Sequence, residues 1–157
     1  MSIELIVVGK TDSKEVAALV ELYAKRVNRY CRFALTTLPD LRETRSLTAR
    51  QQNRAEGERI LGLLHEGDCV VLLDEHGDEL RSVEFAAWIR KRTVSGLKRL
   101  VFVIGGPYGF SDEVYARADH KLSLSRMTFS HQLVRAIFAE QLYRAFSILA
   151  NEPYHHE

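Results

Sequence analysis

The chain contains few cysteines and no long hydrophobic run. Its two cysteines, Cys31 and Cys69, are not spaced as C-x-x-C and occur without a secretory context, so they indicate reduced thiols in a protein core. A disulfide-stapled scaffold is therefore excluded. No stretch approaches the roughly 18 apolar residues of a membrane span, and the apolar run at the N-terminus is too short for a signal peptide. These features predict a soluble cytoplasmic protein with no membrane partner.

The chain also lacks an excess of charge of one sign. It has 22 Lys and Arg residues against 21 Asp and Glu residues, a net charge of +1, so composition gives no global signature of nucleic-acid binding. One local cluster is basic, because Arg90–Arg92 and Lys98–Arg99 place five positive charges and no acid within ten residues. Such a run usually marks a solvated helix end, and a nucleic-acid surface is the alternative.

Several sequence motifs for catalysis are missing. Gly105–Gly109 lacks the G-x-G-x-x-G order of a dinucleotide site, and Glu4 stands where a phosphate loop ending at Gly9–Thr11 requires glycine. No Ser-His-Asp or Cys-His spacing supports a covalent nucleophile. The adjacent residues His155–Glu157 on a terminal tail cannot present several ligands to one ion, so we expect no metal site.

Alternating strand and helix patterns predict one α/β domain over residues 1–157. A chain of this length with 46% hydrophobic residues can bury one core. Strands that alternate with helices favour a mostly parallel sheet of five or six strands flanked by helices. Asp12 or Ser13, Thr48 and Ser82 are expected to cap three helices, the second reaching Leu64, and a fourth, long helix runs from about His131 to Leu149. The expected strands are Ile3–Val8, Arg32–Leu38, Val70–Leu73, Leu100–Ile104 and Lys121–Ser125.

Two corners in the C-terminal half predict a ligand pocket. Gly105–Gly109 follows a buried strand and lets a ligand approach bare backbone, although a plain turn is the alternative. The second corner, Leu122–His131, joins a short strand to the long helix, which Thr128 or Ser130 can cap. Leu73 and Asp74, in a polar loop at the end of another strand, are a possible third wall. Because ligands of open α/β sheets bind beyond the carboxyl ends of strands, we expect the site there.

The long helix predicts a dimer and contains a buried arginine. It has a broad apolar face, and Leu133, Ile137 and Ile148 form a second face that we expect another copy of the chain to cover. Arg135 lies within the broad face, where an internal salt bridge and a substrate phosphate are both plausible partners. Beyond the helix, Pro153 and Tyr154 are expected to fold back onto the pocket mouth.

The sequence resembles the bacterial 23S ribosomal RNA pseudouridine N3-methyltransferases of the SPOUT superfamily. The similar motifs are Ile104–Gly109, Leu122–His131, Gln141–Ser147 and Asn151–His155. The resemblance implies a homodimer with a C-terminal trefoil knot that uses S-adenosylmethionine to methylate N3 of a pseudouridine in 23S rRNA. Ser130 departs from the proline that is common in the family, and His156 from a common Arg or Lys. The implied cofactor-binding residues are Leu73, Gly105, Leu124, Ser125, Arg126, Met127, Thr128 and Phe129.

The resemblance and the expected pocket also suggest residues for the substrate. His131, Tyr154 and His155 are candidate catalytic residues that orient the acceptor base or remove its N3 proton. Arg135 and Arg144 are candidate substrate-binding residues, with Arg126 as a further contact. Two other functions compete with this one: a nucleotide-dependent oxidoreductase and a non-catalytic RNA-binding module.

Overall fold

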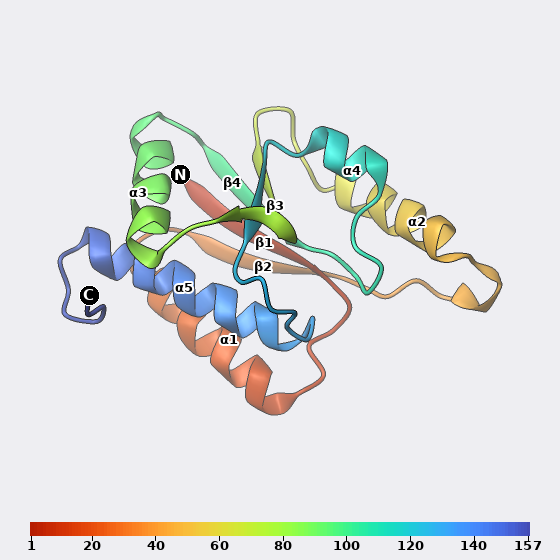
Figure 1. The fold of residues 1–157 in the computed structure, drawn as a ribbon, viewed down its shortest axis with the longest axis horizontal. Coiled ribbons are helices and arrows are strands. Elements are labelled where there is room, and N and C mark those ends of the chain that lie inside the picture. The colour runs from red at the N-terminus through yellow and green to blue at the C-terminus, as the bar shows by residue number, and fades with distance from the viewer.

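One sheet of five parallel strands organises the chain. The computed structural model describes residues 1–157, and the strand order is β2-β1-β4-β3-β5 (Figure 1). All five predicted strands are confirmed, and all pairings between them are parallel. The strands are β1 Ser2–Val8, β2 Phe33–Leu38, β3 Cys69–Glu79, β4 Arg99–Ile104 and β5 His120–Ser123.

Strand β3 is longer than predicted, because the expected polar loop after Leu73 continues as strand. Residues 71–73 pair with residues 120–122 of β5, and after a register shift Asp78 and Glu79 pair with Leu122 and Ser123. A polar segment needs partners for its backbone groups, and the second register on β5 supplies them. The distal half of β3 therefore crosses close over β5.

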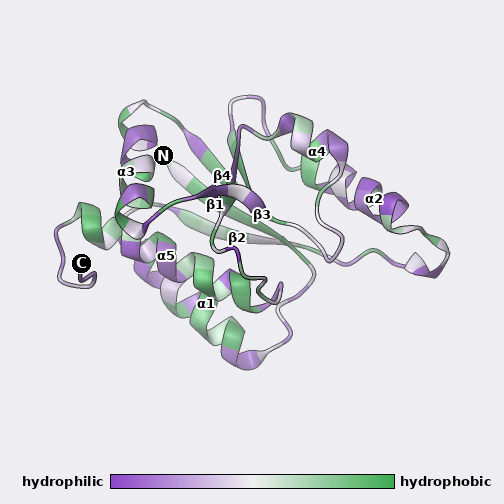
Figure 2. Ribbon diagram, viewed as in Figure 1, coloured by the Kyte–Doolittle hydropathy of each residue, from purple (hydrophilic) through white to green (hydrophobic).

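Helices cover both faces of the sheet and give three layers. Side chains of β1 alternate between the faces: Ile3, Leu5 and Val7 join one hydrophobic cluster, while Ile6 and Val8 join the other. Apolar colour concentrates in the strands and in α5 (Figure 2). No helix of the structure is long and apolar enough to span a membrane. The first face carries α1 Lys14–Val27, α3 Ser82–Val94 and α5 Leu133–Leu149, and the second carries α2 Ala49–Leu61 and α4 Asp112–Arg117, with a 3-10 turn, η1, at Thr44–Ser46.

The predicted helix caps are confirmed in two cases and wrong in one. The hydroxyl of Ser13 accepts a hydrogen bond from the Val16 amide at 3.2 Å, and Thr48 forms a reciprocal capping box with its N3 residue. At α3 the N-cap is Arg81, whose amide donates to Glu84 at 2.6 Å. Ser82 instead donates its hydroxyl to a glutamine of α5, so it joins two helices rather than starting one.

The ends of two other helices also differ from prediction. Helix α2 ends at Leu61, with Gly62 as its C-cap, and the next amides make tighter i to i−3 bonds up to Leu64. Helix α5 begins at Leu133, where the hydroxyl of Ser130 accepts the Leu133 amide hydrogen bond at 3.0 Å. Ser130, not Thr128, therefore caps this start.

Helix α5 lies between α1 and α3, which changes the expectation for its second apolar face. The broad face is buried as predicted, with Phe138 and Leu142 fully enclosed. The neighbouring helices partly cover Ile137 and Ile148, which are half-buried, whereas Leu133 is 43% exposed. Most of the second face is thus covered within one chain, and the uncovered part is its N-terminal end.

The basic cluster lies at the amino edge of the sheet, opposite the predicted pocket. Arg92 stacks over Trp88, 3.2 Å from the ring centroid. Arg99 forms ion pairs with Glu4 and Asp68. Two of the five charges therefore have structural roles inside the chain, as expected for a helix end more than for a nucleic-acid surface.

Candidate functional site

A cavity of about 490 Å³ lies at the carboxyl edge of the sheet, where the sequence predicts it. Three segments form its walls: the middle of β3, the glycine loop after β4, and the corner between β5 and α5. The start of α5 adds His131 and Val134. The remaining lining residues are Leu73–His76, Ile104–Phe110, Tyr115, Leu122, Leu124, Ser125 and Met127–Phe129.

The glycine loop makes a tight turn over residues 106–109. The Gly109 amide donates to the Gly106 carbonyl oxygen at 3.1 Å, and Gly109 has φ of 77°. This turn has proline at its second position and glycine at its fourth, a favoured type I pattern. A Cβ atom on Gly105 would lie 3.0 Å from the ring of Phe110. The turn therefore exposes backbone toward the cavity and is held from behind by an aromatic ring.

Hydroxyl groups shape the corner between β5 and α5. Ser123 donates to the Ser125 carbonyl at 2.9 Å, and the Ser125 hydroxyl accepts from the Met127 amide at 3.0 Å. Thr128 donates to Glu75 of β3 at 3.2 Å, which connects two walls of the cavity. The alternation of serine with apolar residues predicted a strand up to Ser125. In the structure, the strand ends at Ser123 and the following residues form this hydrogen-bonded loop.

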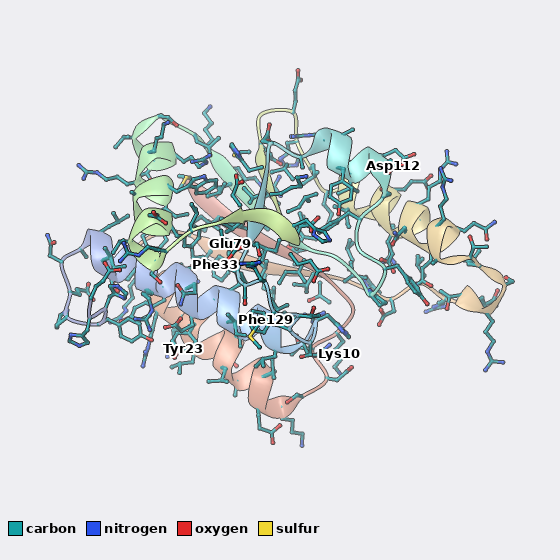
Figure 3. All side chains as sticks on the ribbon, in the orientation of Figure 1. Lys10, Tyr23, Phe33, Glu79, Asp112 and Phe129 are labelled. Atoms are coloured by element: carbon teal, nitrogen blue, oxygen red, sulfur yellow. The ribbon has the colours of Figure 1, made fainter.

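Every predicted cofactor residue except Arg126 lines this cavity. The Arg126 side chain is 86% exposed and points to Glu79 at 3.9 Å. Figure 3 labels Phe129 beside the start of α5, on the cavity side of the molecule. The cavity thus brings together seven predicted residues that are far apart in sequence, and the side chain of Arg126 points away from it.

Asp74 gives the cavity a negative side. Its carboxylate accepts hydrogen bonds from the Tyr115 hydroxyl and from the His76 amide. Burial alone would raise the pKa of Asp74, but these two hydrogen bonds and nearby positive charges lower it overall. Burial and the same contact raise the pKa of Tyr115 to about 12. Asp74 is therefore ionised at neutral pH, and Tyr115 remains a hydrogen-bond donor.

Sequence reasoning missed several lining residues, among them Glu75, His76 and Tyr115. Glu75 and His76 directly follow the predicted strand at Leu73, so their position at a carboxyl end was an available signal. Tyr115 lies in the short helix α4 and has no such signal, because its contact with Asp74 depends on tertiary packing. The cavity thus combines apolar walls, exposed backbone and the carboxylates of Asp74 and Glu75, which suits a small, partly apolar, cationic ligand.

Arg135 is buried inside the chain, which corrects its predicted role toward substrate. Its side chain is 1% exposed, and its guanidinium donates to the carbonyl oxygens of Val8 at 2.9 Å and Gly9 at 2.8 Å. It also donates to the hydroxyl of Thr11 and to the carbonyl of His131. Burial lowers the pKa of Arg135. Backbone carbonyls, rather than a salt bridge or a phosphate, satisfy this arginine, and it fixes α5 to the end of β1.

The C-terminal tail folds onto the far end of α5, so the prediction that it reaches the pocket mouth is wrong within one chain. The Tyr154 hydroxyl donates to Glu140 at 2.9 Å, and its ring packs on Tyr143 at 4.7 Å between centroids. Helix α5 has 17 residues, a length of about 25 Å at 1.5 Å per residue. Residues at its start line the cavity, and the C-terminus of the chain lies beyond its opposite end (Figure 1).

The tail forms a polar cluster with Arg144. This arginine donates to Glu140 at 3.1 Å and lies 3.1 Å from Nδ1 of His155. Burial alone would lower the pKa of Arg144, but Glu140 raises it overall. Because arginine only donates, Nδ1 of His155 accepts and the ring proton is on Nε2, which is buried without a partner. Burial and hydrogen bonds with Tyr23 and Glu140 raise the pKa of Tyr154.

Comparisons with known proteins identify the family. The chain is 57% identical to the ribosomal RNA large subunit methyltransferase H of Christiangramia forsetii over 99% of each chain, and 53% identical to that of Bacteroides fragilis over the full length of both. A probable methylase family protein from Haemophilus influenzae has a similar fold, with a TM-score of 0.50 at 13% identity, covering 99% of this chain and 70% of that one. A family profile described as predicted SPOUT methyltransferase matches residues 1–155. The chain therefore belongs to the SPOUT methyltransferase family.

Proposed function

We propose that this protein, as a single domain, transfers a methyl group from S-adenosylmethionine to N3 of a pseudouridine in 23S rRNA of the large ribosomal subunit, in the cytoplasm. The observation that carries the proposal is the cavity, because seven of the eight cofactor residues that the family resemblance implies line it. The names of the full-length relatives support ribosomal RNA as the substrate. The cavity lacks the motif of a dinucleotide site, and the family argues against a non-catalytic module.

The residues of the cavity fit S-adenosylmethionine. Apolar side chains such as Leu73 and Leu124 suit the adenine ring, and the glycine loop lines the cavity with the backbone of Gly105 and Gly106. The ionised Asp74 favours a ligand that carries positive charge. When bound, the cofactor supplies an activated methyl group, and alignment with the acceptor can contribute several kcal/mol to catalysis, on the order of 7.

The acceptor nitrogen is an imide N–H and must lose its proton. His131 is the candidate that lies at the cavity within the same chain. Tyr154 and His155 lie at the other end of α5, so in this arrangement they serve the cavity only of another subunit. Since the pKa of Tyr154 is raised, it acts as a hydrogen-bond donor there. His155 is the other candidate in the tail, through an Nε2–H that has no hydrogen-bond partner within the chain.

We propose a homodimer to account for this placement. Leu133 on α5 and Leu19 and Leu22 on the adjacent α1 are 43%, 42% and 42% exposed, which leaves apolar surface for a second copy. We propose that dimerisation covers these leucines and brings the tail of one subunit to the cavity of the other. Arg144 would then hold RNA or the tail of the partner subunit near the acceptor base.

The C-terminal trefoil knot belongs to the same proposal. The distal half of β3 crosses β5 so closely that Gly77 touches the backbone of Lys121 and Leu122. This close crossing supports the proposed knot, in which the chain is threaded through the loop that ends in β3.

Methylation of ribosomes tests the function directly. Ribosomes from a strain lacking this protein are incubated with purified protein and S-adenosylmethionine, and mass mapping of the 23S rRNA locates any methylated pseudouridine. We expect one new methyl group on one pseudouridine. Methylation on a uridine carbon or a ribose oxygen would contradict the proposed acceptor, and no methylation despite cofactor binding would favour an RNA-binding module. Binding of NAD(H) but not S-adenosylmethionine would favour the oxidoreductase.

A further inference from the structure

Four exposed arginines lie beside the cavity at the carboxyl edge of the sheet. Arg42, Arg45, Arg50 and Arg54, which we call the arginine ridge, occupy the segment before α2 and its first turns. Only Arg54 has a carboxylate within 4.0 Å, Glu113 at 3.9 Å, and both side chains of that pair are more than half exposed. Ion pairs of this kind contribute little, so all four charges remain free to bind another molecule. Figure 2 shows α2 as largely hydrophilic, and Figure 1 shows that it projects at this edge.

The ridge is fixed to the cavity by direct contacts. Asn53 of α2 donates through Nδ2 to the carbonyl oxygen of Tyr108 at 2.8 Å. Glu56, one turn later, is 5% exposed and lies against Gly106, where a Cβ would be 2.5 Å from its Oε1. These contacts therefore fix the position of α2 relative to the glycine loop.

Tyr108 lies between the ridge and the cavity. It lines the cavity and is 54% exposed, although it is a large aromatic residue. An exposed aromatic ring beside free cations is the combination that binds single-stranded nucleic acid, since bases stack on the ring and phosphates pair with the cations. Arginine suits phosphate because its planar group makes two parallel hydrogen bonds.

Access to the cavity determines where RNA can lie. A base that enters the cavity leaves its neighbouring phosphates outside, at the same edge of the sheet. The other basic cluster, around Arg90 and Lys98, is at the opposite edge, and two of its members are engaged internally. The arginine ridge is thus the basic surface that adjoins the cavity mouth.

We infer that the arginine ridge and Tyr108 form the RNA-contact surface of this enzyme, with Tyr108 stacked on an unpaired base beside the acceptor and the arginines on the flanking phosphates. The inference rests on the proposed function and adds the site at which the RNA is held.

A charge-matched pair of double variants tests the ridge. Arg45→Ala with Arg50→Ala removes two ridge charges, and Arg90→Ala with Lys91→Ala removes two exposed charges from the opposite edge. Binding to ribosomes is measured across salt concentrations, together with KM and kcat for methyl transfer and the affinity for S-adenosylmethionine. For the ridge variant we expect the log-log salt slope to fall by about 2, one for each phosphate contact. We also expect a higher KM for ribosomes with unchanged cofactor affinity, and no change for the control variant.

Substitutions of Tyr108 test the stacking. At saturating cofactor, Tyr108→Phe should keep the wild-type KM for ribosomes, and Tyr108→Ala should raise it about 10-fold, the size of one lost base stack. Two results would overturn the inference: equal salt slopes for the ridge and control variants, or a loss of cofactor affinity in the ridge variant. In either case, methylation by the wild-type protein would still support the proposed function. A wild-type protein that neither binds S-adenosylmethionine nor methylates ribosomes would refute the proposed function itself.

Discussion

Gly77 in β3 touches the backbone of Lys121 in β5, and a Cβ atom at position 77 would fall 2.6 Å from the Lys121 carbonyl carbon. Backbone cannot move aside as a flexible side chain can. This contact fixes how closely the distal half of β3 crosses β5, and so it determines the shape of the cavity wall at Asp74 and Glu75.

Substitution of Gly77 should therefore destabilise the fold. Gly77→Ala is expected to lower the free energy of unfolding by about 1 to 3 kcal/mol, the usual effect of overpacking. Chemical denaturation measures this change. Gly67→Ala is the matched control, because nothing lies within 4 Å of a Cβ at that position. Equal stability of the two variants would show that the crossing tolerates a methyl group.

Substitution of Arg135 should reduce the stability of the fold rather than RNA binding. Arg135→Lys retains the charge but cannot reach the carbonyl oxygens of Val8 and Gly9 together. Unsatisfied buried groups should lower the free energy of unfolding by about 3 kcal/mol. Arg90→Lys on the exposed side of α3 is the control. If Arg135→Lys kept full stability and raised only the KM for ribosomes, the structural role would be wrong.

Asp74 predicts that the cavity distinguishes charged from neutral cofactors. S-adenosylmethionine carries a sulfonium, whereas its demethylated product has a neutral sulfur. Because Asp74 is ionised at neutral pH, Asp74→Asn should weaken binding of the donor by several-fold more than binding of the product. Calorimetric titration with each ligand measures both affinities. An equal loss for both would mean that Asp74 only shapes the cavity.

The position of the tail predicts complementation between two inactive variants. His155→Ala should reduce methyl transfer strongly while leaving cofactor affinity nearly intact, and Gly106→Val should displace the glycine loop and disable the cavity, because its side chain would collide with Glu56. In a mixture, half of the dimers are mixed and each has one intact site, so about a quarter of wild-type activity should return. Native mass spectrometry establishes whether mixed dimers form. If they form but are inactive, each site combines the tail and the cavity of the same subunit.

Glu4 predicts a loss of stability in acid. Burial alone would raise its pKa, but hydrogen bonds from Thr36 and Arg99 and the charge of Arg99 lower it below 4.5 overall. A carboxyl with a depressed folded pKa stabilises the protein fully above its unfolded pKa, and this contribution disappears as the pH falls through the folded value. Glu4→Gln should thus cost about 1 to 3 kcal/mol at pH 7, and the difference from wild type should shrink below pH 4.5.

Unfolding at a series of pH values measures this effect. The exposed residue Glu58 provides the control, as Glu58→Gln should follow the wild-type curve. A difference between wild type and Glu4→Gln that stayed constant with pH would exclude the ionised carboxylate as its source.

The strands, most helix starts and the position of the cavity could be predicted before the structure was known. These depend on local patterns: the apolar runs of β1 and β4, the caps Ser13 and Thr48, and the rule that ligands bind beyond the carboxyl ends of parallel strands. Motif similarity added the cofactor residues, which the cavity then brought together. Periodicity also placed Arg135 correctly on the buried face of α5.

The partners of those residues depended on the three-dimensional fold. The second register of β3 on β5, the carbonyl partners of Arg135 and the turn of Arg126 away from the cavity each depend on chain segments distant in sequence. The tail is the clearest case, because Tyr154 packs on Tyr143 and donates to Glu140, and these partners could not be predicted from the tail alone. Local sequence sets which groups need a partner, and packing in three dimensions sets which partner they find.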